Sequence, residues 1–378
     1  MATTRRTSPS KKAVPDAARL ARALLRWYDR GHRSFVWRAE LGERADPYRV
    51  WLSEMMLQQT QAATVDPYFR KFVARWPTLA DLAAADLDDL LHAWQGLGYY
   101  SRARNLHRAA RILVQEMGGR LPEDEAALRA LPGIGPYSAA AIAAIAFGKP
   151  AVVVDGNVER VIARFFAVKE AFPKAKGRVR ELAAGLTPRA RPGDYAHAIM
   201  ELGGAVCRRS QPDCGRCPWA FACRAYAEGL TDRLPRRAKR GRRPLRHGVA
   251  FWLQRGDGAV LLRRRPEKGL LGGMMEIPST VWRDDAWTLG EALQHVPVPS
   301  ARLRRKRLLP GVVRHEFSHF RLELRVVATA TQGRVKMSED MVWCRPERFA
   351  DYALPSVMRK LIAHVLDGEI PGGEALDL

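Results

Sequence analysis

The stretch LPGIGPYSAAAIAAIAFG, residues 131–148, is the most informative about how the first part of the chain folds. It separates two helical stretches by a short turn in which Gly133 and Gly135 flank Ile134. Glycines at alternate positions permit a tight turn whose backbone N–H groups face outward beside the start of the next helix. The turn therefore predicts a phosphate-binding hairpin between two helices, and an ordinary helix–helix connection is the alternative.

On both sides of this turn, apolar residues recur at spacings of three and four, in short segments broken by glycine and proline. This periodicity is typical of amphipathic helices and predicts an all-α domain over residues 16–229. The expected helices span residues 17–28, 47–61, 65–76, 87–94, 101–116, 123–130, 137–147, 157–166, 174–184 and 194–207.

A basic stretch with two prolines and two glycines follows, LTDRLPRRAKRGRRPLRHG, and it predicts a linker over residues 230–246 that also suits phosphates. The apolar period then changes to two, in VAFWLQRGDGAVLLRRR and FRLELRVVAT. This alternation predicts a second, mostly β domain over residues 247–366, with helices near 289–295 and 356–366. Residues 1–15 and 367–378 are expected to be tails.

The composition points to a polyanionic partner. Lysine and arginine total 63 against 40 acidic residues, a formal net charge of +23, which favours nucleic acid over the alternative of a membrane surface. There is no run of eighteen uncharged apolar residues, and the start MATTRRTSPSKK lacks the apolar stretch of a secretion signal. A soluble, cytoplasmic protein is expected. The basic start is interpreted as a tail, with a transit peptide as the alternative.

Four cysteines lie within seventeen residues, with the spacing C-x6-C-x2-C-x5-C: Cys207, Cys214, Cys217 and Cys223. Four thiolates in one short loop indicate a sulfur-ligated metal site. Structural zinc sites usually have two separated C-x2-C pairs, and this loop has one, so an iron–sulfur cluster is favoured over zinc. Cys344 is expected to be a small core residue.

Glu54, in VWLSEMMLQQTQ (residues 50–61), is a candidate acid catalyst. Three of its four neighbours at helical spacing are apolar, so burial is expected to raise its pKa and keep it protonated near neutral pH. A solvent-facing helix edge is the alternative. Asp155, in AVVVDGNVERV, is placed to cap the next helix, which would orient its carboxylate and keep it ionised, so that the two pKa values are pushed apart.

Taken together, these motifs resemble the MutY-type adenine DNA glycosylases of the helix-hairpin-helix base-excision superfamily, over residues 20–365. The resemblance rests on VWLSEMMLQQTQ, GLGYYSRARNLH, LPGIGPYSAAAIAAIAFG, VDGNVERV, the four-cysteine loop, GLLGGMMEIP and HEFSHF. It implies a 4Fe-4S cluster and a double-stranded DNA substrate with adenine opposite 8-oxoguanine or guanine. It also implies a monomeric bacterial protein, associated with the nucleoid and not with a membrane.

The resemblance assigns the reaction to four residues. Glu54 would protonate N7 of the extruded adenine and later help to activate water. Asp155 would stabilise the oxocarbenium-like sugar, with Tyr137 and Asn157 lining the same pocket. Related endonuclease III-like enzymes have a lysine in place of Tyr137, so a monofunctional glycosylase without strand cleavage is expected.

Further residues are assigned by the same resemblance. Those expected to contact DNA are Gln59, Tyr99, Gly133 and Gly135. Those expected in the adenine pocket are Trp37, Arg38, Leu57 and Met200. Those expected to read 8-oxoguanine are Phe317, Ser318 and His319. Without the resemblance, Tyr99 would be interpreted as core packing, and the Phe-Ser-His segment as a strand edge.

Two features set limits on the interpretation. His197 stands where relatives more often have Glu or Gln. Residues 247–366 resemble a MutT-like Nudix domain but lack its acidic motif, so this domain is expected to read a base and not to hydrolyse a nucleotide. A pyrimidine-lesion glycosylase/lyase and a non-catalytic, cluster-containing DNA-binding regulator remain as alternative functions.

Overall fold

The computed structural model describes residues 16–40, 42–238, 241, 243–267, 269–333 and 335–367. It divides into two compact units: Met1–Ala83 with Arg108–Lys239, and Ala84–His107 with Arg240–Leu378. Residues 84–107, which the sequence places in the helical domain over residues 16–229, group by their contacts with the C-terminal part. The expected tails lie outside the described residues, apart from Asp367.

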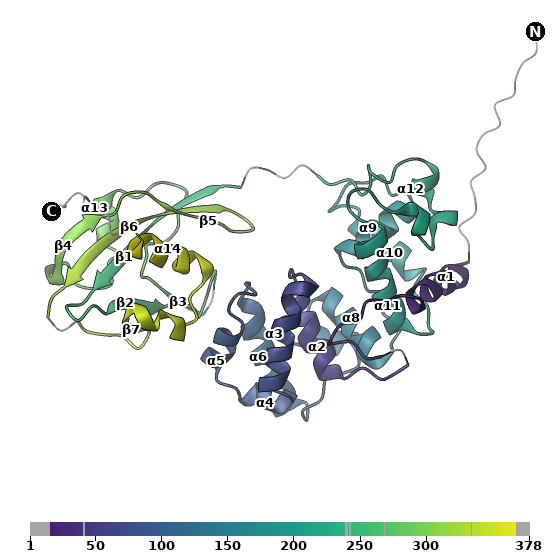
Figure 1. Ribbon diagram of the computed structural model, residues 1–378, viewed down its shortest axis with the longest axis horizontal. Coiled ribbons are helices and arrows are strands. Elements are labelled where there is room, and N and C mark those ends of the chain that lie inside the picture. Colours follow the sequence, from purple (N-terminus) through teal and green to yellow (C-terminus); the bar gives the residue numbers. More distant parts are fainter. Residues whose placement is uncertain are drawn as a thin grey trace, which may run out of the picture. The chain divides into compact units, whose positions relative to one another are not determined.

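Helices form the described chain up to residue 227, as predicted (Figure 1). They are α1 (Ala17–Asp29), α2 (Pro47–Leu57), α3 (Ala62–Arg75), α4 (Leu79–Ala84), α5 (Leu87–Ala93), α6 (Ser101–Glu116), α7 (Glu125–Ala130), α8 (Pro136–Phe147), α9 (Gly156–Phe165), α10 (Lys176–Ala184), α11 (Pro192–Glu201) and α12 (Arg224–Ala227).

Helix α2 is shorter than the sequence predicts. It begins where expected, because Asp46 accepts a hydrogen bond from the Tyr48 N–H and Pro47 occupies the first turn. It ends at Leu57 and not at residue 61, because Gln58 is extended and Gln59 has a φ of 58°. Gln59 is therefore an exposed residue in a left-handed turn, immediately after the helix.

The hairpin between α7 and α8 has the expected form. Gly133 has a φ of 79°, a conformation that glycine adopts without strain, and Gly135 precedes the first residue of α8. Residues Ala139–Ala144 of α8 are buried, and all except Ile142 are alanines, whose small side chains let α2 and α11 approach this helix. The packing of α2 and α11 against α8 brings the candidate site together.

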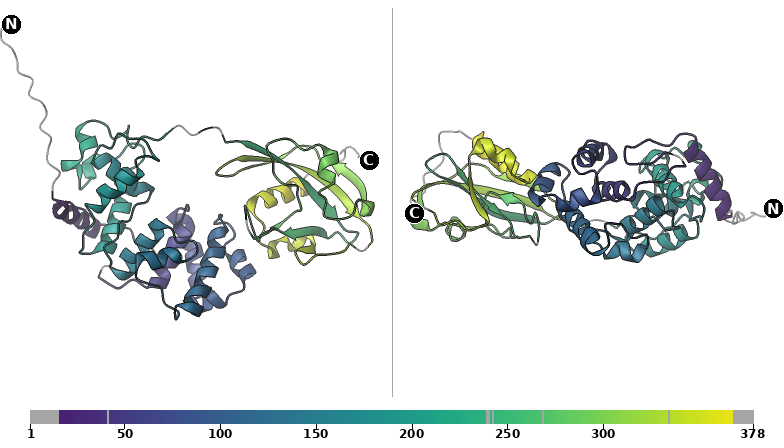
Figure 2. Two further views of the ribbon diagram at one scale, coloured as in Figure 1. Left: turned by 180° about the vertical axis from the view of Figure 1, so that it is seen from behind. Right: turned by 90° about the horizontal axis from the view of Figure 1, so that it is seen from below.

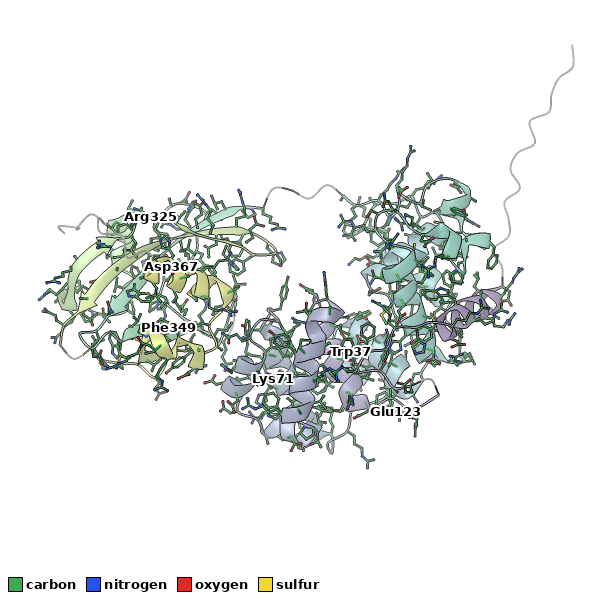
Figure 3. All side chains as sticks on the ribbon, in the orientation of Figure 1. Trp37, Lys71, Glu123, Arg325, Phe349 and Asp367 are labelled. Carbon is green, nitrogen blue, oxygen red and sulfur yellow. The ribbon has the colours of Figure 1, made fainter. Side chains whose placement is uncertain are left out.

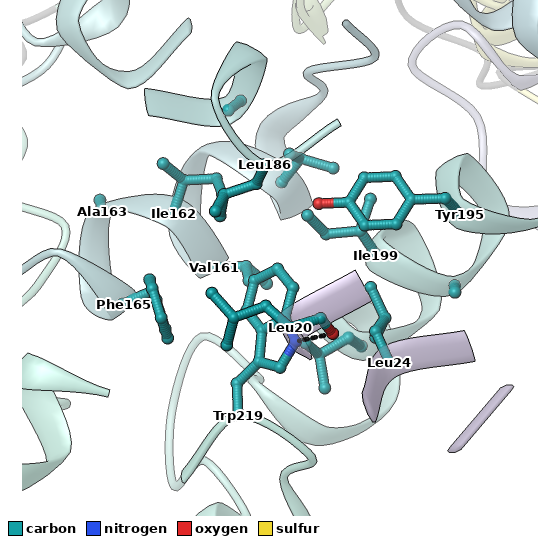
Figure 4. Close-up of a cluster of buried hydrophobic side chains, with 14 of the residues drawn as sticks. Leu20, Leu24, Val161, Ile162, Ala163, Phe165, Leu186, Tyr195, Ile199 and Trp219 are labelled. Atoms are coloured by element: carbon teal, nitrogen blue, oxygen red, sulfur yellow. Dashed lines mark hydrogen bonds between the residues drawn. The ribbon is translucent and has the colours of Figure 1, made fainter. Parts of the chain in front are cut away.

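One hydrophobic core lies beneath the cysteine loop (Figure 4). Trp219, located between two of the cysteines, is buried, and its indole N–H donates to the Leu20 carbonyl oxygen of α1 at 2.9 Å. Phe165 of α9 packs against the same indole, with ring centroids 5.1 Å apart. The loop is thus attached to the helical core through its own tryptophan.

The C-terminal part contains a mixed sheet between two apolar layers (Figure 2). Its strands are β1 (Leu245–Gln254), β2 (Val260–Arg264), β3 (Met275–Glu276), β4 (Leu303–Leu308), β5 (Val313–Glu316), β6 (Arg321–Thr331) and β7 (Met341–Cys344). The order is β3-β2-β1-β6-β4; β5 also pairs with β6, β7 pairs with β2, and only β1 and β6 run parallel.

Alternation along β1 explains the two layers. Ala250 and Trp252 face a cluster that includes α14 (Ser356–Leu366), whereas Val249 and Phe251 face the cluster that includes α13 (Leu289–Leu293). Cys344 is buried in the first of these clusters, as expected.

The expected linker is partly structured, which corrects the prediction for its first half. Leu234 is buried, and Phe172 exchanges backbone hydrogen bonds with Arg236 and Ala238, so the chain packs on the first unit up to residue 238. Lys239, Arg240 and Arg242 lie outside the described residues. Within the described part of the chain, we find no helix that combines the length and the apolar character needed to cross a bilayer.

Candidate active site

Glu54 is a buried carboxylic acid. Its side chain is on α2 and is 5% exposed, which excludes the alternative of a solvent-facing helix edge. Its Oε2 atom is buried and has no hydrogen-bond partner among the described residues. Burial raises the pKa of Glu54 to about 7, and the neighbouring Asp155 adds to the shift; a hydrogen bond from Tyr137 and the charge of Arg38 oppose it. Glu54 is therefore an acid that can still hold its proton near neutral pH.

Tyr137 and Met200 lie beside this acid. Tyr137 is in the first turn of α8, directly after the hairpin, and its hydroxyl oxygen lies 3.2 Å from Sδ of Met200 on α11. Burial raises the pKa of Tyr137 well above its usual value, with Glu54 and Asp155 contributing. Tyr137 thus stays neutral and links α8, α11 and the acid on α2.

Asp155 caps α9, as the sequence predicts. Its Oδ1 accepts hydrogen bonds from the N–H groups of Asn157 at 2.9 Å and Val158 at 2.7 Å, and its Oδ2 accepts one from the Asn157 side chain at 3.0 Å. Burial nevertheless raises the pKa of Asp155, although these bonds and Arg160 oppose the shift. Capping therefore does not by itself set the pKa of Asp155, because burial raises it as burial raises that of Glu54.

A chain of hydrogen bonds joins Asp155 to the cysteine loop. Arg160 on α9 donates from Nη2 to Oδ1 of Asn157 at 2.8 Å and to the Gly203 carbonyl oxygen at 2.7 Å. Its Nε donates to the carbonyl oxygen of Cys207 at 2.7 Å. The orientation of Asn157, and through it that of Asp155, therefore depends on where the loop holds Cys207. Arg160 was not among the residues predicted from the sequence, although it follows Asn157 by one helical turn.

A buried ion pair lies at the predicted adenine pocket. Arg38 donates from Nη1 to Oε1 of Glu201, and the backbone N–H of Arg33 donates to Oε2 of the same carboxylate at 3.2 Å. Glu201 is 2% exposed, so this pair is shielded from water. The Arg38 guanidinium also packs over the Phe35 ring, at 4.7 Å from the centroid. The sequence identified Arg38 but not Glu201, its buried counter-ion.

The other residues assigned to the pocket have different surroundings. Trp37 (Figure 3) is buried; it stacks on Phe35 at 4.9 Å and meets the Phe69 ring edge-on at 5.7 Å, so packing accounts for its position. Leu57 is half-buried at the end of α2. Burial, Arg38 and His32 hold the pKa of His197 well below its usual value, so this ring on α11 is neutral at physiological pH.

Gln58 connects the acid-bearing helix to the hairpin. Its amide nitrogen donates to the carbonyl oxygen of Gly133 and to Oγ of Ser138, each at 3.1 Å. These bonds fix the end of α2 against the start of α8. Sequence reasoning singled out Gln59 and passed over Gln58, which is the residue that ties the two elements.

The four cysteines line one cavity in the first unit. It is bounded by Cys207, Cys214, Cys217 and Cys223, together with Arg164, Asp213 and Trp219 among others. None of the four forms a disulfide, and their sequence spacing and common cavity form a donor set that suits a sulfur-ligated cluster. Among the described residues, no three His, Cys, Asp or Glu side chains are grouped closely enough to hold a single metal ion.

The predicted 8-oxoguanine residues lie in the turn between β5 and β6. The Phe317 N–H donates to the Phe320 carbonyl oxygen at 2.9 Å, which closes the turn, and the Phe317 ring packs on Trp282 with centroids 5.6 Å apart. Ser318 and the exposed Tyr99 share a hydrogen bond of 2.8 Å within the second unit. These residues, with His319, line a cavity of ≈ 440 Å³ in this unit.

Comparisons with known proteins find one family for the helical part of the chain and another for the part that contains the sheet. Residues 52–189 match the HhH-GPD superfamily base excision DNA repair protein family, and residues 249–364 match the NUDIX domain family. The chain is 28% identical to a thermostable thymine-DNA glycosylase of known structure, with a TM-score of 0.51 over 56% of this chain and 97% of that one. The helical fold and the added Nudix-like domain are thus confirmed.

Relatives with both halves identify the family. The adenine DNA glycosylase of Homo sapiens is 35% identical over 93% of this chain and 74% of its own length. That of Rattus norvegicus is 36% identical over 92% and 78%. That of Arabidopsis thaliana is 34% identical over 84% and 58%. From this similarity and the site described above, the chain belongs to the MutY-type adenine DNA glycosylases of base excision repair.

Proposed function

We propose that the protein removes adenine opposite 8-oxoguanine or guanine from double-stranded DNA, after rotating the adenine out of the helix. The observation that carries this proposal is the buried Glu54 carboxyl, which has a pKa of about 7 and an oxygen without a partner. A buried polar atom without a hydrogen bond is costly, and N7 of an adenine in this site would supply the missing partner.

The residues support acid-catalysed cleavage of the N-glycosidic bond. The Glu54 O–H would donate its proton to N7 of adenine, so that the bond between C1′ and N9 breaks and its electron pair leaves with the base. Asp155 would stabilise the positive charge that develops on the sugar. The Glu54 carboxylate would then accept a proton from the attacking water, which leaves an abasic site and restores the acid. Tyr137 and Asn157 would orient these two carboxyl groups.

We further propose that Cys207, Cys214, Cys217 and Cys223 hold a 4Fe-4S cluster. Four cysteines that line one cavity and form no disulfide, next to a buried arginine, are a suitable donor set. When bound, the cluster would supply cross-links that keep the loop folded. Through its hydrogen bonds, Arg160 would make the orientation of Asn157 and Asp155 depend on the position of Cys207.

Recognition of the opposite base is proposed for the second unit. The cavity lined by Tyr99, Phe317, Ser318 and His319 combines aromatic rings with hydroxyl and imidazole groups, which suits an oxidised purine. Gln59 and Tyr99 are exposed and have φ values of 58° and 48°, and exposed residues held in such strained turns are suited to enter a duplex.

A duplex with a single A:8-oxoguanine pair tests the proposal. Incubation followed by hot alkali should cleave the adenine strand with the wild type, and cleavage should fall by at least about a hundredfold with Glu54→Gln. Because Tyr137 cannot form a Schiff base, borohydride should trap little protein on DNA. Binding without alkali-dependent cleavage would instead support the DNA-binding regulator, and efficient trapping would support a lyase.

A further inference from the structure

Arg164, on α9, is an arginine buried beside the cysteine loop. Its side chain is 2% exposed, and all its donor groups face backbone or sulfur. Nε donates to the Leu234 carbonyl oxygen at 2.9 Å. The two Nη atoms donate to the carbonyl oxygens of Cys207, Arg208 and Arg209 at 3.3, 2.6 and 3.1 Å. Nη1 also lies 3.3 Å from Sγ of Cys207.

These contacts leave the charge of Arg164 unbalanced. Burying a guanidinium without an anion is costly, and carbonyl oxygens solvate the charge without cancelling it. Among the described residues, no carboxylate lies within ion-pairing distance of Arg164. Asp213, which borders the same cavity, pairs instead with the exposed Arg216 at 3.8 Å. The cysteine thiolates that line this cavity would therefore supply the anion that balances Arg164.

We infer that Arg164 is the buried counter-ion of the cysteine-ligated cluster, and that its charge and its N–H bond to the Cys207 sulfur protect the cluster from oxidation. This inference rests on the proposed 4Fe-4S cluster. Cluster-bound thiolates are negatively charged, and a positive charge or a hydrogen bond at sulfur stabilises the more electron-rich state. Removal of an electron by an oxidant such as ferricyanide, which takes up that one electron, is thereby opposed.

Arg164 also connects the loop to the chain that follows it. The bond from Nε to Leu234 joins the cysteine loop to residues 230–238, which pack on the first unit. Loss of the cluster would leave the arginine without its anion and weaken both attachments. Arg164 is thus a positioning residue for the cluster, whereas Arg160 connects Cys207 to the side chain of Asn157.

The test uses three variants of the full chain. Arg164→Lys keeps the charge, Arg164→Gln keeps an N–H donor without charge, and Arg164→Met keeps neither. Arg216→Met is the matched control, because this arginine lies between two of the cysteines but its side chain is 79% exposed. Iron and sulfide content, visible absorbance, the reduction potential by voltammetry and the rate of bleaching by ferricyanide are measured for each.

The variants should differ in reduction potential and in the rate of bleaching by ferricyanide. The glutamine and methionine variants should have lower reduction potentials than the wild type, and Arg164→Met should bleach about 10- to 100-fold faster. Arg164→Lys should keep a potential near that of the wild type. Arg216→Met should behave as the wild type, because solvent screens an exposed charge.

An Arg164→Met protein with wild-type potential and bleaching rate would overturn the inference. If the neutral variants are not recovered folded, Arg164→Lys provides the test. A reduction potential of this variant well below that of the wild type would show that the charge of Arg164 does not determine the potential of the cluster. A wild-type protein without iron and sulfide, or with zinc alone, would refute the proposed cluster and with it this inference, whereas an unchanged Arg164→Met protein that contains the cluster would refute the inference alone.

Discussion

At the scale of single residues, the pKa of Glu54 controls when the site can act. The acid must be protonated, so the rate of adenine release should fall as the pH rises through about 7. Tyr137→Phe removes a hydrogen bond that lowers this pKa, so the decline should move to higher pH. Single-turnover rates of adenine release between pH 5 and 9, for the wild type and for Tyr137→Phe, measure this move.

Tyr195→Phe is the matched control for this change. Tyr195 is also a buried tyrosine of the first unit, on α11, but it does not contribute to the pKa of Glu54. Its pH profile should coincide with that of the wild type. A Tyr137→Phe profile that moves to lower pH would contradict the assignment of Glu54 as the acid.

The same carboxyl should cost the protein stability at alkaline pH. The folded pKa of Glu54 lies above its unfolded value, so the folded state binds more protons, and stability falls as the pH rises from about 4.5 to about 7. Glu54→Gln removes this cost and should raise the free energy of unfolding by up to about 3 kcal/mol at pH 8, but not at pH 4.

Urea unfolding of both proteins at the two pH values measures the difference. Glu181→Gln, at an exposed position on α10, is the control and should change stability by less than about 0.5 kcal/mol. An equal gain from Glu54→Gln at both pH values would mean that ionisation is not the cause.

At the scale of elements, the hairpin between α7 and α8 can be tested with its two glycines. Gly133 has a φ of 79°, so Gly133→Ala should destabilise the protein by about 1–2 kcal/mol. Gly135 has a φ of −86° and open space around it, so Gly135→Ala should change stability far less. Urea unfolding of the pair measures the difference, and equal losses would contradict a strained turn.

Helix α9 should transmit the position of the cysteine loop to the site. Arg160→Gln breaks the bonds that Arg160 donates to the Asn157 side chain and to the Cys207 and Gly203 carbonyl oxygens, so Asp155 loses its orientation. We expect the single-turnover rate to fall by about 10- to 100-fold. Affinity for an uncleavable duplex should change much less.

Arg180→Gln provides the comparison, because Arg180 is an exposed arginine of the neighbouring α10 that pairs with Glu125 at 3.6 Å. Its rate should match the wild type. If Arg160→Gln lost affinity and rate in equal measure, Arg160 would be a DNA-binding residue and not a positioning one.

At the scale of the whole molecule, the charge of +23 should dominate binding to undamaged DNA. Each phosphate contact releases counterions, so affinity should fall steeply and linearly on a log–log plot of salt concentration. With six to ten contacts, the loss between 50 and 200 mM salt is roughly 10³- to 10⁵-fold. Fluorescence anisotropy measures it, and a flat response would refute the electrostatic interpretation.

The sequence by itself determined the local features. Apolar periods of three to four and of two distinguished the helical part from the sheet, and Asp155 was recognisable as a helix cap because capping depends on adjacent residues. The apolar neighbours of Glu54 along α2 indicated its burial correctly. The cysteine spacing indicated that the four cysteines lie together in one loop, and they line one cavity.

The tertiary structure alone decided which distant residues meet. Glu201 pairs with Arg38 across 163 positions, and Arg164 reaches Leu234 across 70. The end of α2, the grouping of residues 84–107 and the burial of Leu234 also depend on such contacts. Caps and periods are set by neighbours in the chain, whereas the partner of a buried charge and the rise in the pKa of Asp155 are set by whatever the fold brings beside it.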